Sequence, residues 1–84
     1  MADTFQIEIA TPEKLVVQQR AESAQIPGKD GYMGILPGHA ALLSELGAGT
    51  LSVTSGGQTQ SFTITGGYVE VRDNHVRVLV DRVE

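Results

Sequence analysis

The chain has 84 residues, enough for one domain over residues 1–84, and its six Lys and Arg against ten Asp and Glu give a net charge of -4. The absence of cysteine excludes disulfides and thiolate metal sites, and the acidic balance argues against a nucleic-acid partner, which needs a basic stripe. No apolar run approaches the roughly 18 residues of a membrane span, and the first residues do not resemble a signal peptide. A cytosolic location, or a mature organellar one, is therefore the default.

The first third of the chain is predicted to be extended. Apolar Phe5, Ile7 and Ile9 alternate with other residues, which is typical of a strand with one buried face. Residues 11–14 contain a proline and predict a turn. The stretch from 15 to 26 is a second extended segment whose alternation is blurred, which indicates a bend, a bulge or a strand that changes sheets.

The middle segment, residues 27–49, holds six of the ten glycines and two of the three prolines. This density predicts tight turns and special backbone angles rather than regular structure. Within it, the apolar run at 40–46 is predicted to be either a strand or a single helical turn. Because apolar residues on such a rigid segment need cover, they either plug one end of the fold or contact a partner.

Period-two alternation returns after residue 50. The strand around Leu51 is followed by a hairpin turn at residues 55–58, and further short strands are separated by Gly66-Gly67 and by a turn at Asp73-Asn74. Six or more short strands divided by turn residues predict an all-β sandwich or barrel.

Catalytic, metal and phosphate sites find little support in the sequence. His39 and His75 have no motif that brings partners to them, and two distant histidines without cysteine do not make a metal-ligand set. The glycines around Lys29 lack the spacing of a phosphate-binding loop. We therefore expect no enzyme activity, no cofactor, no metal and no small-molecule ligand.

One run in the middle segment resembles a known family. Residues 34–40, Gly-Ile-Leu-Pro-Gly-His-Ala, followed by Leu42 and Leu43, closely resemble the epsilon subunit of F-type ATP synthases, called delta in mitochondria. Three further stretches match in the same order, at residues 11–13, 66–71 and 74–81. The resemblance covers essentially the whole chain.

The resemblance implies a flattened β-sandwich of about ten short strands in two sheets. It also implies a non-catalytic subunit of the central stalk, or rotor, which joins the gamma subunit to the c-ring so that proton-driven rotation powers ATP synthesis. By position, the c-ring contacts would be Gly31, Tyr32, Met33 and His39, and the gamma contacts Ala41, Leu42 and Leu43. Leu42 and Leu43 have the alternative of lying in the core.

The sequence ends at Glu84, where members of this family usually continue into a C-terminal helical hairpin that can inhibit ATP hydrolysis. We therefore expect coupling without this inhibitory arm, whether the chain is a trimmed piece or a naturally short form. The expected location is peripheral, on the cytoplasmic face of a bacterial inner membrane, with the mitochondrial matrix or plastid stroma as alternatives.

Two rival functions stay open at this stage. A free-standing binding module for small ligands or glycans would need clustered exposed aromatics, and the chain has four aromatic residues, two of which lie in alternating strands and are expected in the core. A small enzyme on a β-scaffold would need a convergent polar site, which the sequence does not show.

Overall fold

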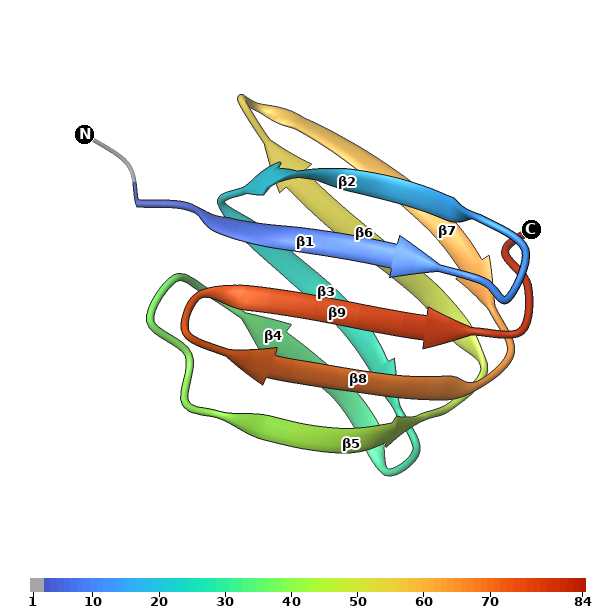
Figure 1. Cartoon of the computed structure of the whole chain (residues 1–84). Helices are drawn as coiled ribbons and strands as arrows, with labels where there is room; N and C mark the ends of the chain where they lie inside the picture. Colours follow the sequence, from blue (N-terminus) through green and yellow to red (C-terminus); the bar gives the residue numbers. More distant parts are fainter. Residues whose placement is uncertain (1–2) are drawn as a thin grey trace.

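The computed structural model describes residues 3–84, which form β-strands joined by short turns (Figure 1). These residues contain nine strands, and the prediction of an all-β fold is confirmed. Along residues 3–84, no helix is long and apolar enough to cross a membrane. In chain order the strands are β1 (Phe5–Ala10), β2 (Leu15–Ala21), β3 (Ser23–Gly28), β4 (Gly31–Ile35), β5 (Leu42–Leu46), β6 (Gly49–Ser55), β7 (Gln58–Ile64), β8 (Gly67–Arg72) and β9 (His75–Val80).

The first three strands follow the sequence pattern. In β1 alternate residues are buried, and a turn follows in which the Thr11 N–H donates to the carbonyl of Lys14 at 2.9 Å. The extended stretch 15–26 is divided at Glu22 into β2 and β3. Because β2 pairs with β1 whereas β3 pairs with β4 and β6, the chain moves from one layer of the fold to the other at this point. Two of the alternatives for this stretch are therefore observed: the chain changes layers at Glu22, and β2 has a bulge at Val16, since Ile9 pairs with Val17 but Ala10 pairs with Leu15.

The prediction that residues 27–49 lack regular structure is wrong for residues 31–35. Residues 31–35 form β4, which pairs antiparallel with β3, and residues 42–46 form β5, which pairs with β8. The strand β4 has the sequence Gly-Tyr-Met-Gly-Ile, and its Met33 and Ile35 side chains, two positions apart on one face, pack on the core. Burial of these side chains stabilises a glycine-rich strand that propensity alone disfavours. Of the two alternatives for residues 40–46, the strand is observed.

The strands form two layers that are joined into one curled sheet (Figure 1). One layer has the order β2-β1-β9-β8-β5, and the other contains β4, β3, β6 and β7. A single residue pair, Gly28 with Leu46, connects β3 to β5 and so links the layers. The neighbours β1 and β9 run parallel, whereas the other pairs are antiparallel. The expectation of about ten strands in two sheets thus becomes nine strands in one hydrogen-bonded sheet, eight of them on one path and β4 beside β3, with the outline of a sandwich.

The core lies between the layers and is entirely apolar among residues 3–84. Its buried side chains are Phe5, Ile7, Ile9, Ala21, Ala24, Ile26, Ile35, Leu46, Leu51, Val53, Ile64, Val69, Val71, Val76, Val78 and Val80. Burying one Val, Ile, Leu or Phe side chain contributes about 1.5–3 kcal/mol, so this core supplies the main favourable term in folding. Of the two aromatics expected inside, Phe5 is buried and Phe62 is half-buried against the core.

The strand β4 has its two ends at opposite ends of the sandwich (Figure 1). The end of the sandwich at which β4 begins is called the Tyr32 end, and it contains the β3–β4 turn at residues 29–30. The other, the His39 end, contains the β4–β5 loop at residues 36–41 and the β8–β9 turn at Asp73-Asn74. This distinction decides which of the candidate contact residues can share a partner.

Candidate docking surfaces

The strand β5 separates the three residues predicted to contact the gamma subunit. Ala41 is exposed in the loop before the strand, Leu42 packs against the core, and Leu43 is 74% exposed on the outside of the layer. Successive side chains of a strand point to opposite faces, so Leu42 and Leu43 cannot both face outward. Of the two leucines, Leu42 therefore belongs to the core, whereas Leu43 faces outward and does not.

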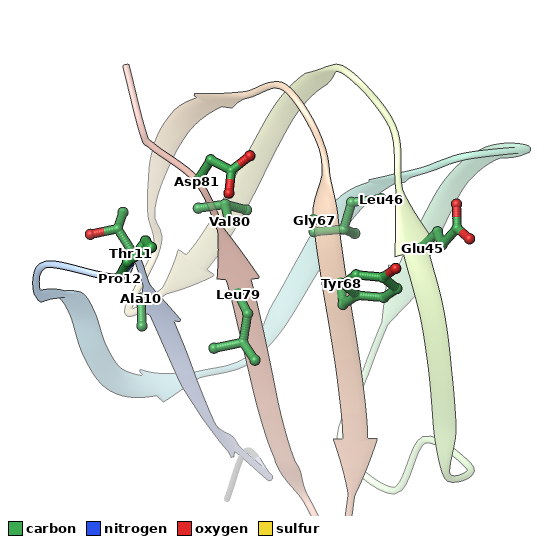
Figure 2. Close-up of a pocket in the computed structure, with 10 residues that line it drawn as sticks. All are labelled: Ala10, Thr11, Pro12, Glu45, Leu46, Gly67, Tyr68, Leu79, Val80 and Asp81. Carbon is green, nitrogen blue, oxygen red and sulfur yellow. The ribbon is translucent and has the colours of Figure 1, made fainter.

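An apolar row crosses the outer face of the layer that contains β5. The register of the strands places Leu15, Ala10, Leu79 and Tyr68 side by side on β2, β1, β9 and β8. Leu15 and Leu79 are each 49% exposed and Tyr68 is 55% exposed. Figure 2 shows Leu79 between Ala10 and Tyr68 on neighbouring strands. Exposed apolar side chains arranged in a continuous row, rather than scattered singly, are typical of a protein-docking surface.

A shallow depression of about 560 Å³ lies along this row, and Figure 2 shows the residues that line it. Gly67 forms part of its lining between Leu46 and Val80, with which it is paired. Its φ of 133° lies in the region that favours glycine, and a Cβ there would overlap the carbonyl oxygen of Leu79. Gly67 therefore permits the close approach of β8 and β9 beneath the apolar row.

A charged row runs parallel to the apolar row on the same face. Glu8 stands at its centre, with His75 Nε2 at 2.7 Å and Arg77 Nε at 3.5 Å from its Oε1 atom, and the Gln18 amide donates to Oε2 at 3.1 Å. These partners hold the pKa of Glu8 below its ordinary value, chiefly through the hydrogen bond from His75, and desolvation opposes this in part. The row reaches Leu43 through Glu70, which is paired with both Leu43 and Arg77.

The edge of β4 carries three of the residues predicted to contact the c-ring. Gly31 and Tyr32 are exposed, whereas Met33 is half-buried and packs against the core. The Tyr32 hydroxyl accepts a hydrogen bond from the Thr50 N–H at 3.0 Å, so it ties β4 to the start of β6. Although its hydroxyl is hydrogen-bonded, Tyr32 is 58% exposed.

His39, the fourth predicted c-ring contact, lies in a type II turn. The His39 N–H donates to the Leu36 carbonyl at 3.1 Å, Pro37 occupies the second position, and Gly38 has a φ of 84°. The Nδ1 atom of His39 is 2.7 Å from the carbonyl oxygen of Ala40, and a carbonyl only accepts, so Nδ1 carries the proton in this bond. This leaves Nε2 as the ring atom available to a partner.

The structure does not gather the four predicted c-ring residues at one point. Gly31, Tyr32 and Met33 are consecutive on β4, whereas His39 lies beyond the opposite end of that strand. The His39 turn is instead next to Ala41 and the β8–β9 turn, with which it borders a depression of about 280 Å³. A partner that contacts all four residues has to extend along the whole β4 edge.

Several ionisable side chains in the part of the chain that the structure describes are engaged in local contacts. No three His, Asp or Glu side chains within residues 3–84 gather as a metal-ligand group. The two histidines are engaged separately, His39 with a backbone carbonyl and His75 with Glu8. The exposed apolar row is suited to recognition of another macromolecule through apolar contact, and the polar side chains beside it can add hydrogen bonds.

The fold and these surfaces define a small β-sandwich domain with an exposed apolar row on one face. The family described as ATP synthase, Delta/Epsilon chain, beta-sandwich domain has a model that matches residues 4–84, and the chain belongs to this family. The resemblance seen in residues 34–43 and the three companion stretches is thus confirmed.

Relatives named ATP synthase epsilon chain share much of the sequence. The one from Koribacter versatilis (strain Ellin345) is 51% identical over 84 residues, and the alignment covers 100% of this chain and 59% of the relative. The one from Solibacter usitatus (strain Ellin6076) is 46% identical over 84 residues, covering 100% of this chain and 63% of the relative. The chain thus spans about three fifths of the length of these relatives.

Solved structures support the fold. A chain from the Euglena gracilis mitochondrial ATP synthase, in a structure of OSCP/F1/c-ring in rotational state 1, superposes with a TM-score of 0.90 at 24% identity, covering 96% of this chain and 52% of that chain. A chain from the central stalk/c-ring of the Tetrahymena thermophila mitochondrial ATP synthase superposes with a TM-score of 0.80 at 21% identity, covering 94% of this chain and 64% of that chain. At this identity the likeness establishes the arrangement of the strands.

Sequence reasoning missed the apolar row and the side chain that is hydrogen-bonded to the His39 turn. Tyr68 and Leu79 occupy outward positions in strands whose other outward residues are charged, and that mismatch is a signal for a docking face. Asn74, which was predicted only to turn the chain, also accepts a hydrogen bond from Gly38. No sequence pattern reveals that bond, because the two residues are 36 positions apart.

Proposed function

We propose that this chain is a non-catalytic rotor subunit of the central stalk of an F-type ATP synthase, which joins the gamma subunit to the c-ring. The observation that carries the proposal is membership of the ATP synthase delta/epsilon β-sandwich family over residues 4–84. The structure adds a reason why such a domain transmits torque. Its entirely apolar core and single hydrogen-bonded path of strands, both within residues 3–84, make a stiff body that resists deformation under load.

The proposed gamma-binding surface is the outer face of the layer that contains β5. Leu43 is 74% exposed there, and the apolar row of Leu15, Ala10, Leu79 and Tyr68 extends the surface across four more strands. Covering these side chains removes apolar area from water, which favours association. Ala41 lies at the margin of this surface, and Leu42 acts from below by packing β5 onto the core.

The proposed c-ring contact follows the edge of β4 from Gly31, Tyr32 and Met33 to His39. This edge is open in the described sheet, since β4 pairs with β3 alone. Tyr32 offers an exposed ring and His39 offers Nε2 as a hydrogen-bonding atom, which suits the polar loops of a c-ring. Met33 is half-buried against the core, so part of its side chain is available to this contact.

The proposal extends to location and to the organisation of the chain. Residues 1–84 act as one domain, and the subunit works as a peripheral part of the complex on the cytoplasmic face of a bacterial inner membrane. The bacterial relatives named ATP synthase epsilon chain favour this location over an organelle. Neither cofactor nor metal takes part in the coupling role.

The test is to mix the purified chain with the gamma subunit and with a gamma–c-ring complex, and to measure binding at micromolar concentration. A stable stoichiometric complex is expected with both. Leu43→Asp should weaken gamma binding by about 2 kcal/mol or more while the chain stays folded, because it replaces the most exposed apolar side chain of this face, at 74% exposure, with a charge that the partner would have to cover.

Ser61→Asp is the matched control, because it puts the same charge on an exposed position of β7 in the other layer. It should bind gamma like the wild-type chain. If neither gamma nor the gamma–c-ring complex binds the wild-type chain, the rotor role is wrong, and a free-standing binding module becomes the better account of the apolar row.

A further inference from the structure

The turn that carries His39 is held to the rest of the molecule by one side chain. The Gly38 N–H donates to Asn74 Oδ1 at 2.6 Å. Among the described residues, this is the one hydrogen bond that connects the loop at 36–41 to another element, since the other bonds of the loop lie within it. The position of His39 relative to the sheet therefore depends on Asn74.

Asn74 is itself fixed by the sheet. It forms a two-residue hairpin turn with Asp73, and both have positive φ values, of 53° and 59°, as a type I′ turn requires. The backbone carbonyl of Asn74 accepts a hydrogen bond from the Gln6 N–H at 2.9 Å. The residue thus links β1, the β8–β9 turn and the His39 turn, and its side chain starts from a backbone that is anchored on two sides.

The His39 turn has little other support. Leu36 is 62% exposed, and Gly38, Ala40 and Ala41 are also exposed. A segment with few buried apolar contacts opens locally at low free energy, unless a hydrogen bond holds it. The Gly38–Asn74 bond is suited to this purpose because it joins the turn to a tight hairpin.

We infer that Asn74 is the positioning residue for the His39 turn, and that it presents His39 Nε2 to the polar loops of the c-ring. This inference rests on the proposed function, because it names how one part of that contact surface is prepared for binding. Preorganisation of the turn in its bound conformation reduces the entropy lost when the contact forms. Asn74 acts through His39 and needs no contact of its own with the c-ring.

Two substitutions separate the side-chain bond from the turn. Asn74→Gly keeps the hairpin, because Asp-Gly suits a type I′ turn, but it removes the acceptor for Gly38. Asn74→Asp keeps an acceptor oxygen and tolerates positive φ. The matched control is Glu22→Ala, which removes a similar bond at the β6–β7 turn, where Glu22 Oε1 accepts from the Gly56 N–H at 3.0 Å.

The experiment measures binding of the 84-residue chain and each of its variants to the gamma–c-ring complex, together with hydrogen exchange and the chemical shift of the Gly38 amide by NMR. Asn74→Gly should speed exchange of the Gly38 amide, shift its proton resonance upfield and weaken binding about two- to tenfold, the range that one hydrogen bond supports. Asn74→Asp should restore both readouts to near the wild-type values, and Glu22→Ala should leave both unchanged.

Three results would overturn the inference. If Asn74→Gly leaves the Gly38 amide unchanged, Asn74 does not hold the turn. If the amide changes but binding to the gamma–c-ring complex does not, the turn needs no positioning for that contact. If the wild-type chain does not bind the complex, the proposed function fails and the inference fails with it.

Discussion

His75 Nε2 lies 2.7 Å from Glu8 Oε1, although the two residues are 67 positions apart in the sequence. The parallel pairing of β1 with β9 brings them together, and Arg77 approaches the same carboxylate oxygen from the next outward position of β9. The Glu8 side chain is 17% exposed, so it is shielded from water more than either partner. This contact joins the first and last strands of the fold on its outer face.

The stability contributed by Glu8 depends on pH. Its pKa is lowered in the folded state, first by the hydrogen bond from His75. A carboxyl group with a lowered folded pKa stabilises the fold above its unfolded pKa of about 4.3, and this contribution is lost as pH falls through the folded pKa. Glu8→Gln should therefore be less stable than the wild-type chain at about pH 5.5, and the difference should shrink toward about pH 3.

Urea unfolding at both pH values measures this difference. Glu13→Gln is the control, because it removes an exposed carboxylate from the β1–β2 turn. Within residues 3–84, the Glu13 side chain forms no hydrogen bond or ion pair, and only its backbone N–H is bonded, to the Thr11 hydroxyl. The two pH values lie about one unit above and below the ordinary pKa of Glu. If the difference in unfolding free energy between Glu8→Gln and the wild-type chain is the same at about pH 5.5 and about pH 3, the predicted pH dependence is wrong.

Leu42 and Leu43 should respond oppositely to substitution. Leu42→Ala is expected to destabilise the fold by about 2 kcal/mol, because the side chain packs on the core, whereas Leu43→Ala should change stability by no more than about 0.5 kcal/mol. The effect on gamma binding should be the opposite: Leu43→Ala should lower the affinity for gamma more than Leu42→Ala does. Chemical denaturation and gamma titration of both variants provide the comparison, and equal destabilisation by the two would mean that Leu43 is not free at the surface.

Much of the fold follows from local pattern. The alternation of Phe5, Ile7 and Ile9 predicts β1 correctly, and Asp73-Asn74 predicts its hairpin, because strand burial and turn geometry act over a few residues. The strand β4 was not predicted, because its glycines disfavour a strand locally and only packing of Met33 and Ile35 reverses that preference. Local pattern fails where tertiary burial decides.

The candidate site was predictable to a smaller extent. The resemblance marked the segment around His39 and Leu43, but alternation alone did not say which of the two adjacent leucines faces outward. The apolar row that includes Tyr68 and Leu79 depends on the register of strands far apart in the sequence, and so does the Gly38–Asn74 bond. These relationships require the pairing of the strands to be known first.

The hydroxyl and the ring of Tyr32 should have different roles, the hydroxyl in stability and the ring in docking. Tyr32→Phe removes the acceptor for the Thr50 N–H but keeps the exposed ring, so it should destabilise the fold by about 0.5–1.5 kcal/mol and leave c-ring binding unchanged. Tyr32→Ala should reduce both stability and binding. Thermal unfolding together with a binding titration distinguishes them, and a loss of c-ring binding in Tyr32→Phe would show that the hydroxyl, rather than the ring, serves the contact.

Two glycines offer a matched test of the packing beneath the apolar row. Gly67→Ala should destabilise the fold by about 3 kcal/mol or more, because φ is 133° and the new Cβ would overlap the Leu79 carbonyl oxygen, which is backbone and cannot move aside. Gly34→Ala on the open β4 edge meets no atom within 4 Å and should be neutral or stabilising by about 0.5 kcal/mol.

The midpoints of urea unfolding for the two variants, measured with equal slopes, give both free energies. Gly67→Ala should also weaken gamma binding in the fraction that stays folded, because forcing β8 and β9 apart displaces Tyr68 from Leu79 in the apolar row. If Gly67→Ala is as stable as Gly34→Ala, the close approach of β8 to β9 is not required, and the register that builds the apolar row is incorrect.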